Sequence, residues 1–252
     1  MTIYVNNGKI LVCRIYMRII IYKTGGTKMK YEIIGQTVPA VEVTLSQGES
    51  MFTQSGGMVW QTNGIAMSTN ARGGLARSLG RMFTGESIFM ANYTAEIEGA
   101  KIAFGSTVPG TVVPVDISQG ELIVQKGSFL CAQQSVDLKA TFTKKFTAGL
   151  FGGEGFILQR LFGSGMAFLE VDGDMVERVL APGEVLKVDT GNVVAFETTV
   201  NYDIETVKGL GNIFLGGEGL FITKLTGPGK VILQTQNFND FAGKIIARVP
   251  KG

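Results

Sequence analysis

Three copies of a short phrase containing glycine and glutamate constrain the fold of this 252-residue chain more than any other feature. The copies are residues 83–87 (Phe-Thr-Gly-Glu-Ser), 151–155 (Phe-Gly-Gly-Glu-Gly) and 215–219 (Leu-Gly-Gly-Glu-Gly). Their Gly-Glu steps begin at residues 85, 153 and 217, so the spacings are 68 and 64 residues. A period of this length, kept twice, indicates one structural unit that is used three times.

A second Gly-Glu step recurs with a similar period, beginning at residues 48, 120 and 183. Each copy is followed by another glycine and then by an apolar run, as strands separated by tight turns are. Two phrases that recur in the same order make coincidence a poor explanation. We therefore expect an all-β fold of three tandem β-sandwich-like repeats packed into one compact body, a pseudo-threefold internal duplication.

The composition agrees with an all-β class. The chain has 35 glycines but only 6 prolines, and 45% of its residues are hydrophobic, enough for a substantial core. In residues 38–45, Val41, Val43 and Leu45 alternate with polar residues, which is typical of a half-buried strand. Trp60 and most phenylalanines fall in similar runs, so we expect them in the core. Residues 240–246 fit either a short helix or a last strand.

The first 28 residues differ from the rest, because they contain five basic residues and no acidic one. The remaining chain has 18 basic and 21 acidic residues, so the basic balance belongs to this N-terminal extension. We interpret residues 1–28 as disordered or as the product of a mis-assigned start, with Met29 as the true beginning. A basic amphipathic membrane anchor is the alternative. Residues 29–252 then form a single β body, with repeats at about 38–113, 114–177 and 178–247.

The chain contains no histidine, which argues against many common enzyme and metal sites. Its absence removes Ser-His-Asp and Cys-His machinery and the usual zinc and iron ligands. Two cysteines, Cys13 and Cys131, cannot form a disulfide framework or a zinc site, and we expect Cys131 to be a buried thiol. We therefore expect no catalytic residues, metal or cofactor, and we do not expect an enzyme. With no evident secretory signal, a cytoplasmic location fits best.

Two groups of charged residues are candidates for a functional site. Arg72, Arg77 and Arg81 accompany two glycines and form a candidate anion-contact loop, although a solvated loop is the more common outcome. No aromatic residues interleave with these arginines, so stacking on nucleic-acid bases is unsupported. The repeated phrases also contain glutamates, which either do acid–base chemistry or accept hydrogen bonds from turn amides, and we favour the second reading. These repeat-turn glutamates are Glu86, Glu154 and Glu218, with Glu49, Glu121 and Glu184 in the second phrase.

Residues 80–89, 149–156 and 168–173 are similar to conserved phrases of the altered inheritance of mitochondria protein 24 family. The chain resembles a bacterial member of this family over about residues 29–252. The resemblance implies a β fold similar to that of the tryptophan RNA-binding attenuation protein, built as a threefold internal duplication. It also implies a link to membrane organisation, through a mitochondrial relative. It implies no catalytic residue, and a shared fold does not by itself imply RNA binding.

Three functions are consistent with the sequence. We favour a non-catalytic assembly or scaffold protein that forms a homo-oligomer, because β units with many edges and no catalytic constellation suit that role. The second is a module that binds RNA or anionic lipid through the basic loop, in the cytoplasm or associated with a membrane. The third, a carboxylate-based hydrolase, is the least favoured. A peripheral membrane or protein partner accords with the first two.

Overall fold

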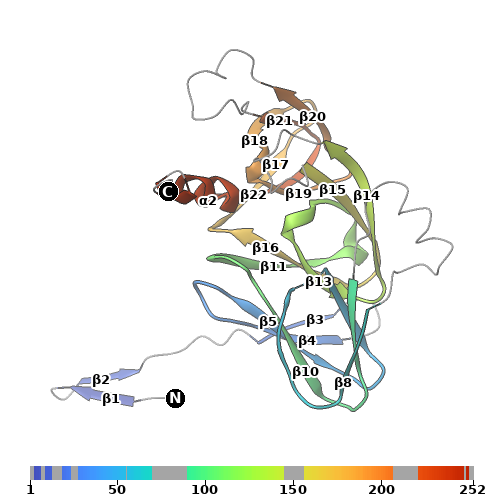
Figure 1. The fold of residues 1–252 in the computed structure, drawn as a ribbon, viewed down its shortest axis with the longest axis vertical. Coiled ribbons are helices and arrows are strands. Elements are labelled where there is room, and N and C mark those ends of the chain that lie inside the picture. Colours follow the sequence, from blue (N-terminus) through green and yellow to red (C-terminus); the bar gives the residue numbers. More distant parts are fainter. Residues whose placement is uncertain are drawn as a thin grey trace.

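The computed structural model describes residues 3–6, 9–12, 19–23, 28–54, 56–69, 90–144, 156–206, 221–246 and 248–249. Antiparallel strands make up most of these residues, and the α-helix among them, α2 (Phe238–Ile246), lies near the C-terminus (Figure 1). The all-β prediction is confirmed. The alternation of apolar and polar side chains explains why: in β5 (Ala40–Leu45), Val41, Val43 and Leu45 are fully buried on one face.

Among the described residues, four strands precede β5. β1 (Ile3–Asn6) and β2 (Lys9–Val12) pair with each other. β3 (Ile19–Lys23) pairs with β4 (Lys28–Ile34), and β4 pairs with β5. β3 and β4 therefore extend the sheet that contains β5, whereas β1 and β2 form a separate two-stranded sheet.

In the described residues, the rest of the β body consists of three stretches of six strands each. The first stretch, residues 40–105, contains β5, β6 (Ser50–Gln54), β7 (Met58–Gln61), β8 (Ile65–Thr69), β9 (Met90–Ala95) and β10 (Ala100–Gly105). The second, residues 110–172, contains β11 (Gly110–Asp116), β12 (Leu122–Gln125), β13 (Phe129–Gln133), β14 (Val136–Lys144), β15 (Phe156–Gly163) and β16 (Met166–Asp172). The third, residues 175–234, contains β17 (Met175–Leu180), β18 (Val185–Asp189), β19 (Val193–Glu197), β20 (Asn201–Thr206), β21 (Phe221–Thr226) and β22 (Gly229–Gln234). Short 3₁₀ turns occupy Ile117–Gln119, Lys126–Ser128 and Thr190–Asn192.

Strand pairing follows one scheme in all three stretches. The first strand pairs with the sixth, and the sixth with the third. The second strand pairs with the fifth, and the fifth with the fourth. Each pairing of third and sixth strands also contains a register shift. The origin of the three stretches by internal duplication stays a prediction, and these pairings are the observations that such an origin has to explain.

The stretches are joined to one another by strand pairing. β6 of the first stretch pairs with β13 of the second, and β12 of the second pairs with β19 of the third. We call these two pairings the internal joints. They produce two six-stranded sheets, with the orders β11-β16-β13-β6-β9-β8 and β14-β15-β12-β19-β22-β17. At the two ends of the body remain the sheets β3-β4-β5-β10-β7 and β18-β21-β20.

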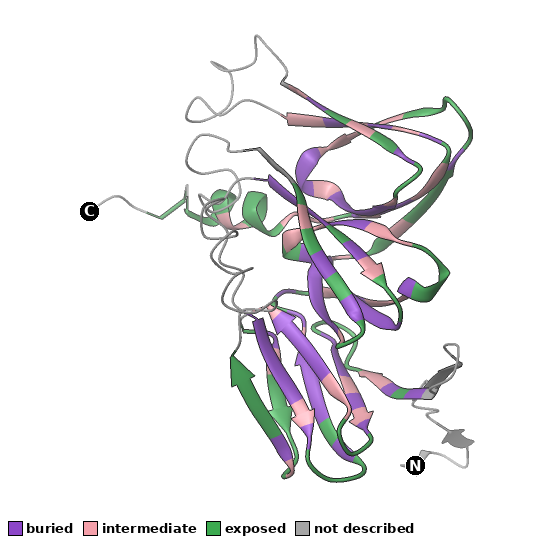
Figure 2. Cartoon of the chain, turned by 90° about the vertical axis from the view of Figure 1, so that its right-hand side faces the viewer, coloured by how far each residue is buried: buried purple, intermediate pink, exposed green. Residues whose placement is uncertain are grey.

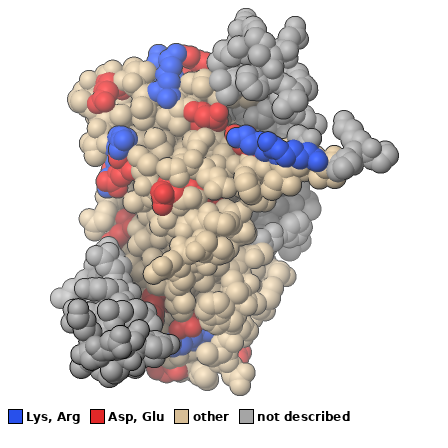
Figure 3. All heavy atoms as spheres, turned by 90° about the vertical axis from the view of Figure 1, so that its left-hand side faces the viewer, with Lys and Arg blue, Asp and Glu red and all other residues tan. Residues whose placement is uncertain are grey.

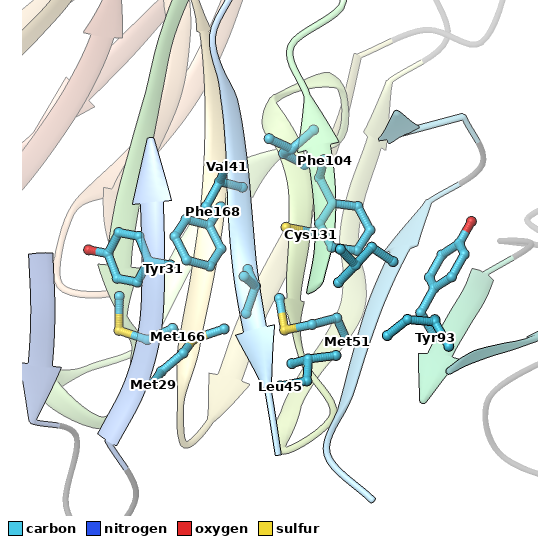
Figure 4. Packing of buried hydrophobic residues seen from close by; sticks show 14 of the residues in the cluster. Met29, Tyr31, Val41, Leu45, Met51, Tyr93, Phe104, Cys131, Met166 and Phe168 are labelled. Atoms are coloured by element: carbon cyan, nitrogen blue, oxygen red, sulfur yellow. The ribbon is translucent and has the colours of Figure 1, made fainter. Parts of the chain in front are cut away.

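Buried residues occur in strands along the body (Figure 2), and their side chains form three hydrophobic clusters. The first cluster contains residues of β4 and of the first two stretches, and in it the Tyr31 and Phe168 rings meet edge to face at 4.9 Å (Figure 4). Cys131 is fully buried in this cluster, as predicted, and its burial raises the pKa of the thiol well above its ordinary value. The core therefore runs across the joints between stretches.

Candidate functional site

The site residues predicted from the sequence fall outside the described part of the chain. Arg72, Arg77, Arg81 and Glu86 lie in residues 70–89, Glu154 in residues 145–155, and Glu218 in residues 207–220. All three segments connect the fourth strand of a stretch to the fifth. The anion-contact loop and the arrangement of these glutamates therefore stay predictions.

The glutamates of the second Gly-Glu phrase do lie in the described region. The backbone N–H of Ser46 donates to Glu49 Oε2 at 3.1 Å, and that of Ala181 donates to Glu184 Oε2 at 2.8 Å. In both cases the carboxylate reaches back three residues and closes its own turn, as predicted. Glu121 differs, because it forms an ion pair with the Arg160 guanidinium instead. These carboxylates therefore contact the protein's own turns and a neighbouring strand.

Glu170 on β16 is a partly buried carboxylate that sequence reasoning missed. Its Oε2 accepts hydrogen bonds from Ser106 Oγ and from both the backbone N–H and the hydroxyl of Thr107, at 2.9–3.2 Å. Burial raises the pKa of Glu170, although these donors act in the opposite direction. A glutamate at an alternating strand position gives no sequence signal for burial of this kind. Because the one oxygen serves all three donors, Glu170 fixes the loop after β10.

A groove of about 900 Å³ runs along β11, bordered by Gly35, Pro39 and the start of β22. Its carboxylates have structural partners. Asp116 Oδ1 accepts from the Ser118 N–H at 2.9 Å, Glu197 Oε2 from the Lys230 N–H at 2.9 Å, and Glu177 lies 3.4 Å from Lys230 Nζ. The carboxylates of the groove therefore bind the protein's own turns and neighbouring strands.

β7 ends its sheet and leaves apolar side chains at the surface. Val59 is 55% exposed and Trp60 is 40% exposed, so the prediction that Trp60 lies in the core is wrong. The reason is topological: in the described residues β10 borders β7 on one side, and no strand borders it on the other. Trp60 instead donates its indole N–H to Glu42 Oε2 at 3.0 Å. The first open edge of the body is therefore strand β7.

β18 is the corresponding strand at the other end of the body. Within the described residues it pairs with β21 and with no other strand. Val185 is 47% exposed, and Lys187 Nζ lies 2.8 Å from Glu205 Oε2 at the surface. β18 is the second open edge, and together β7 and β18 are called the open edges below.

Helix α2 presents a third surface. Its first N–H, that of Phe238, donates to Asp172 Oδ2 at 2.8 Å, which fixes the start of the helix to β16. Burial raises the pKa of Asp172, and this hydrogen bond opposes the shift. None of the helix residues is buried, and α2 lies on the outside of the body (Figures 1 and 2). Its exposed large apolar side chains are Phe238, Phe241, Ile245 and Ile246.

Charged side chains are mixed in sign on the face shown in Figure 3, with basic and acidic groups dispersed among uncharged ones. Among the described residues, no group of three or more cysteine, aspartate or glutamate side chains is placed to hold a metal ion. No helix in the described ranges is both long and apolar enough to span a bilayer. The exposed apolar side chains of α2 offer apolar contact, and the open edges β7 and β18 offer backbone pairing.

Comparison with known proteins places the chain in one family. Residues 31–236 match the family described as mitochondrial biogenesis AIM24. An uncharacterized protein of Streptococcus pyogenes serotype M6 is 28% identical over 220 residues, which covers 84% of this chain and 87% of that protein. The crystal structure of another Streptococcus pyogenes protein has a TM-score of 0.71 at 26% identity, covering 88% of this chain and 100% of that one. Because the family match spans most of the β body, the chain belongs to the AIM24 family.

Proposed function

We propose that the protein is a non-catalytic assembly protein, which acts by binding partners through its surface. The observation that carries this proposal is the unburied helix α2, whose apolar residues 238, 241 and 245 follow the spacing of one helix face. A short helix with an uncovered apolar face gains little from folding alone, since helices draw most of their stability from packing. The anchored start of α2 holds that face in a fixed place, which suits docking.

The contacts of the acidic groups support the non-catalytic part of the proposal. Glu49 and Glu184 close turns, Glu170 holds a loop and Asp172 caps α2. A general acid or base needs an oxygen directed at a substrate. In the described residues, one oxygen of each of these four carboxylates accepts a hydrogen bond from a backbone N–H of the protein itself.

An anionic lipid surface is a second candidate partner for α2. Lys244 lies in the last turn of the helix and Arg248 follows it, where Arg248 donates to the Lys244 carbonyl at 2.9 Å. Cations beside an apolar helix face that contains phenylalanine are typical of helices that lie in a membrane interface. Asp240 in the first turn opposes this attraction, so we rank this function second.

A double substitution on α2 tests the proposal. Phe241→Ser with Ile245→Ser removes two exposed apolar side chains and should abolish complementation of a deletion strain, together with the in-cell cross-links of the protein to its partners. The matched control is Val38→Ser with Met67→Ser, which removes two apolar side chains of similar exposure elsewhere and should leave both intact. Flotation with phosphatidylglycerol vesicles distinguishes the lipid candidate from a protein partner.

Two results would overturn the proposal. Full complementation and unchanged cross-links with the α2 double variant would remove the docking role. Multiple turnover of a substrate by the purified protein, abolished by Glu170→Gln, would contradict the absence of catalysis.

A further inference from the structure

The two internal joints connect the stretches in the same way. In each, the second strand of one stretch pairs antiparallel with the third strand of the next stretch. At the first joint Phe52 of β6 lies opposite Ala132 of β13, and at the second Ile123 of β12 lies opposite Phe196 of β19. Within the described residues, no earlier stretch pairs with the third strand of the first stretch, β7, and no later stretch pairs with the second strand of the third stretch, β18. β7 therefore corresponds to the third-strand partner of such a joint, and β18 corresponds to the second-strand partner.

Burial separates the joined strands from their open counterparts. β13 and β19 each bury four of five residues, and β6 buries three of five. None of the four residues of β7 and none of the five residues of β18 is buried. A strand edge with exposed apolar side chains is a template for pairing with another chain. Both open edges have exposed apolar side chains of this kind.

Backbone groups at both open edges point outward. The Thr62 N–H donates to the Lys101 carbonyl of β10 at 2.9 Å, and backbone groups alternate sides along an antiparallel strand. Gln61 therefore turns its N–H and C=O away from β10. Likewise the Gly227 N–H donates to the Glu184 carbonyl at 2.9 Å, so Lys187, three residues further, faces away from β21. Each edge offers a donor and an acceptor to an incoming strand.

We infer that β7 of one copy pairs with β18 of a second copy, which repeats the internal joint between molecules. The inference deepens the proposed assembly function and rests on it, by naming the partner as a second copy of this chain. Because different strands meet, the contact is heterologous, and successive copies add head to tail into a ring or a filament. Every copy keeps its α2 helix, so assembly multiplies the number of docking helices.

Proline substitutions at the two outward positions test this inference. Gln61→Pro and Lys187→Pro each remove one edge donor without removing a backbone hydrogen bond of the body, and proline is tolerated at such edge positions. Lys187→Pro also removes the surface ion pair with Glu205, which Lys187→Ala removes as well. Native mass spectrometry of the wild-type protein should show multimers of the 27.0 kDa chain, whereas each proline variant alone should be a monomer. An equimolar mixture of the two variants should form a 1:1 heterodimer, since one intact β7 and one intact β18 remain.

Three controls separate edge pairing from misfolding. Gln61→Ala and Lys187→Ala keep the backbone donor and should keep the multimers. Met67→Pro places proline on β8, an edge outside the joint, and should also keep them, because the Glu96 N–H bond to Gly64 indicates that Met67 faces away from β9. If a proline variant fails to fold, Val59→Lys retains every donor of β7 and should still weaken assembly by burying a charge.

The outcomes are distinct. A wild-type monomer at micromolar concentration, or a mixture of variants without heterodimer, overturns the inference. Dimers of Gln61→Pro alone would indicate β18–β18 pairing and would also overturn it. If α2-dependent docking persists in a strictly monomeric protein, the proposed function stands without this inference. If multimers form but α2 binds nothing, the inference stands without the docking role.

Discussion

The internal joints and the open edges use equivalent strands in opposite circumstances. β6 and β13 meet inside the chain, and their apolar residues are mostly buried. β7 and β18 occupy the same places in the pairing scheme, and all their residues retain exposure. The difference teaches that the position of a strand in the order of stretches decides whether a neighbouring strand covers it. It also shows that, among the described strands, β7 and β18 lack the second neighbouring strand that their counterparts have.

The largest expected effect comes from breaking an internal joint. Phe52 is fully buried and stacks on Phe129 with ring centroids 5.4 Å apart. Phe52→Ala should lower the free energy of unfolding by about 3–5 kcal/mol, because it leaves a cavity between two stretches. Val59→Ala on the open strand β7 should cost less than about 0.5 kcal/mol in the monomer. Equilibrium denaturation of both variants makes the comparison, and equal losses would contradict it.

A hydrogen bond across the same joint should have a medium effect. The buried Thr53 hydroxyl of β6 donates to the Leu130 carbonyl of β13. Thr53→Val keeps the shape but removes the donor, so we expect a loss of about 1 kcal/mol in the free energy of unfolding. Thr53→Ser retains a hydroxyl and is the matched control, to be measured in the same denaturation series. A Thr53→Val protein as stable as the wild type would show that this bond contributes nothing to the joint.

The smallest effect concerns how β7 is held. Glu42 accepts from Lys101 Nζ at 2.7 Å and from the Trp60 indole at 3.0 Å, and the Lys101 hydrogen bond is the main cause of its lowered pKa. Since the folded pKa is below the ordinary 4.5, the stabilisation is present above that value and is lost as the pH falls through the folded pKa. Glu42→Gln should cost about 0.2–1 kcal/mol near neutral pH. Denaturation at neutral and acidic pH measures this difference, and a loss that is the same at both would contradict the assignment.

Local patterns in the sequence predicted the fold class, whereas pairing between stretches left no local signal. The alternation of Val41, Val43 and Leu45 and the Gly-Glu turns depend on near neighbours, and the structure contains both. The contact between Phe52 and Ala132 joins residues 80 positions apart, which no periodicity records. The sequence therefore predicts Trp60 in the core, because its strand has the apolar pattern of a covered strand.

The candidate site was less predictable than the fold. The predicted arginines and the glutamates of the first phrase lie outside the described residues, so the structure does not test these predictions. The sequence of residues 240–246 is compatible with either a helix or a strand. Gly243 weakens a helix, and the segment is too short for the spacing of its apolar residues to decide. The structure has a helix at Phe238–Ile246. The open edges can be identified only from the order of strands in the sheets, which the three-dimensional structure provides.

Hydrogen exchange at two amides tests the pairing of β7 with β18 most directly. The N–H groups of Gln61 and Lys187 point away from their own sheets, so they exchange rapidly in a monomer and slowly once a strand pairs with them. We predict that protection of both amides rises together with protein concentration, and that the Lys187→Pro variant loses the protection of Gln61. Rapid exchange of both amides at every concentration would contradict the pairing of β7 with β18.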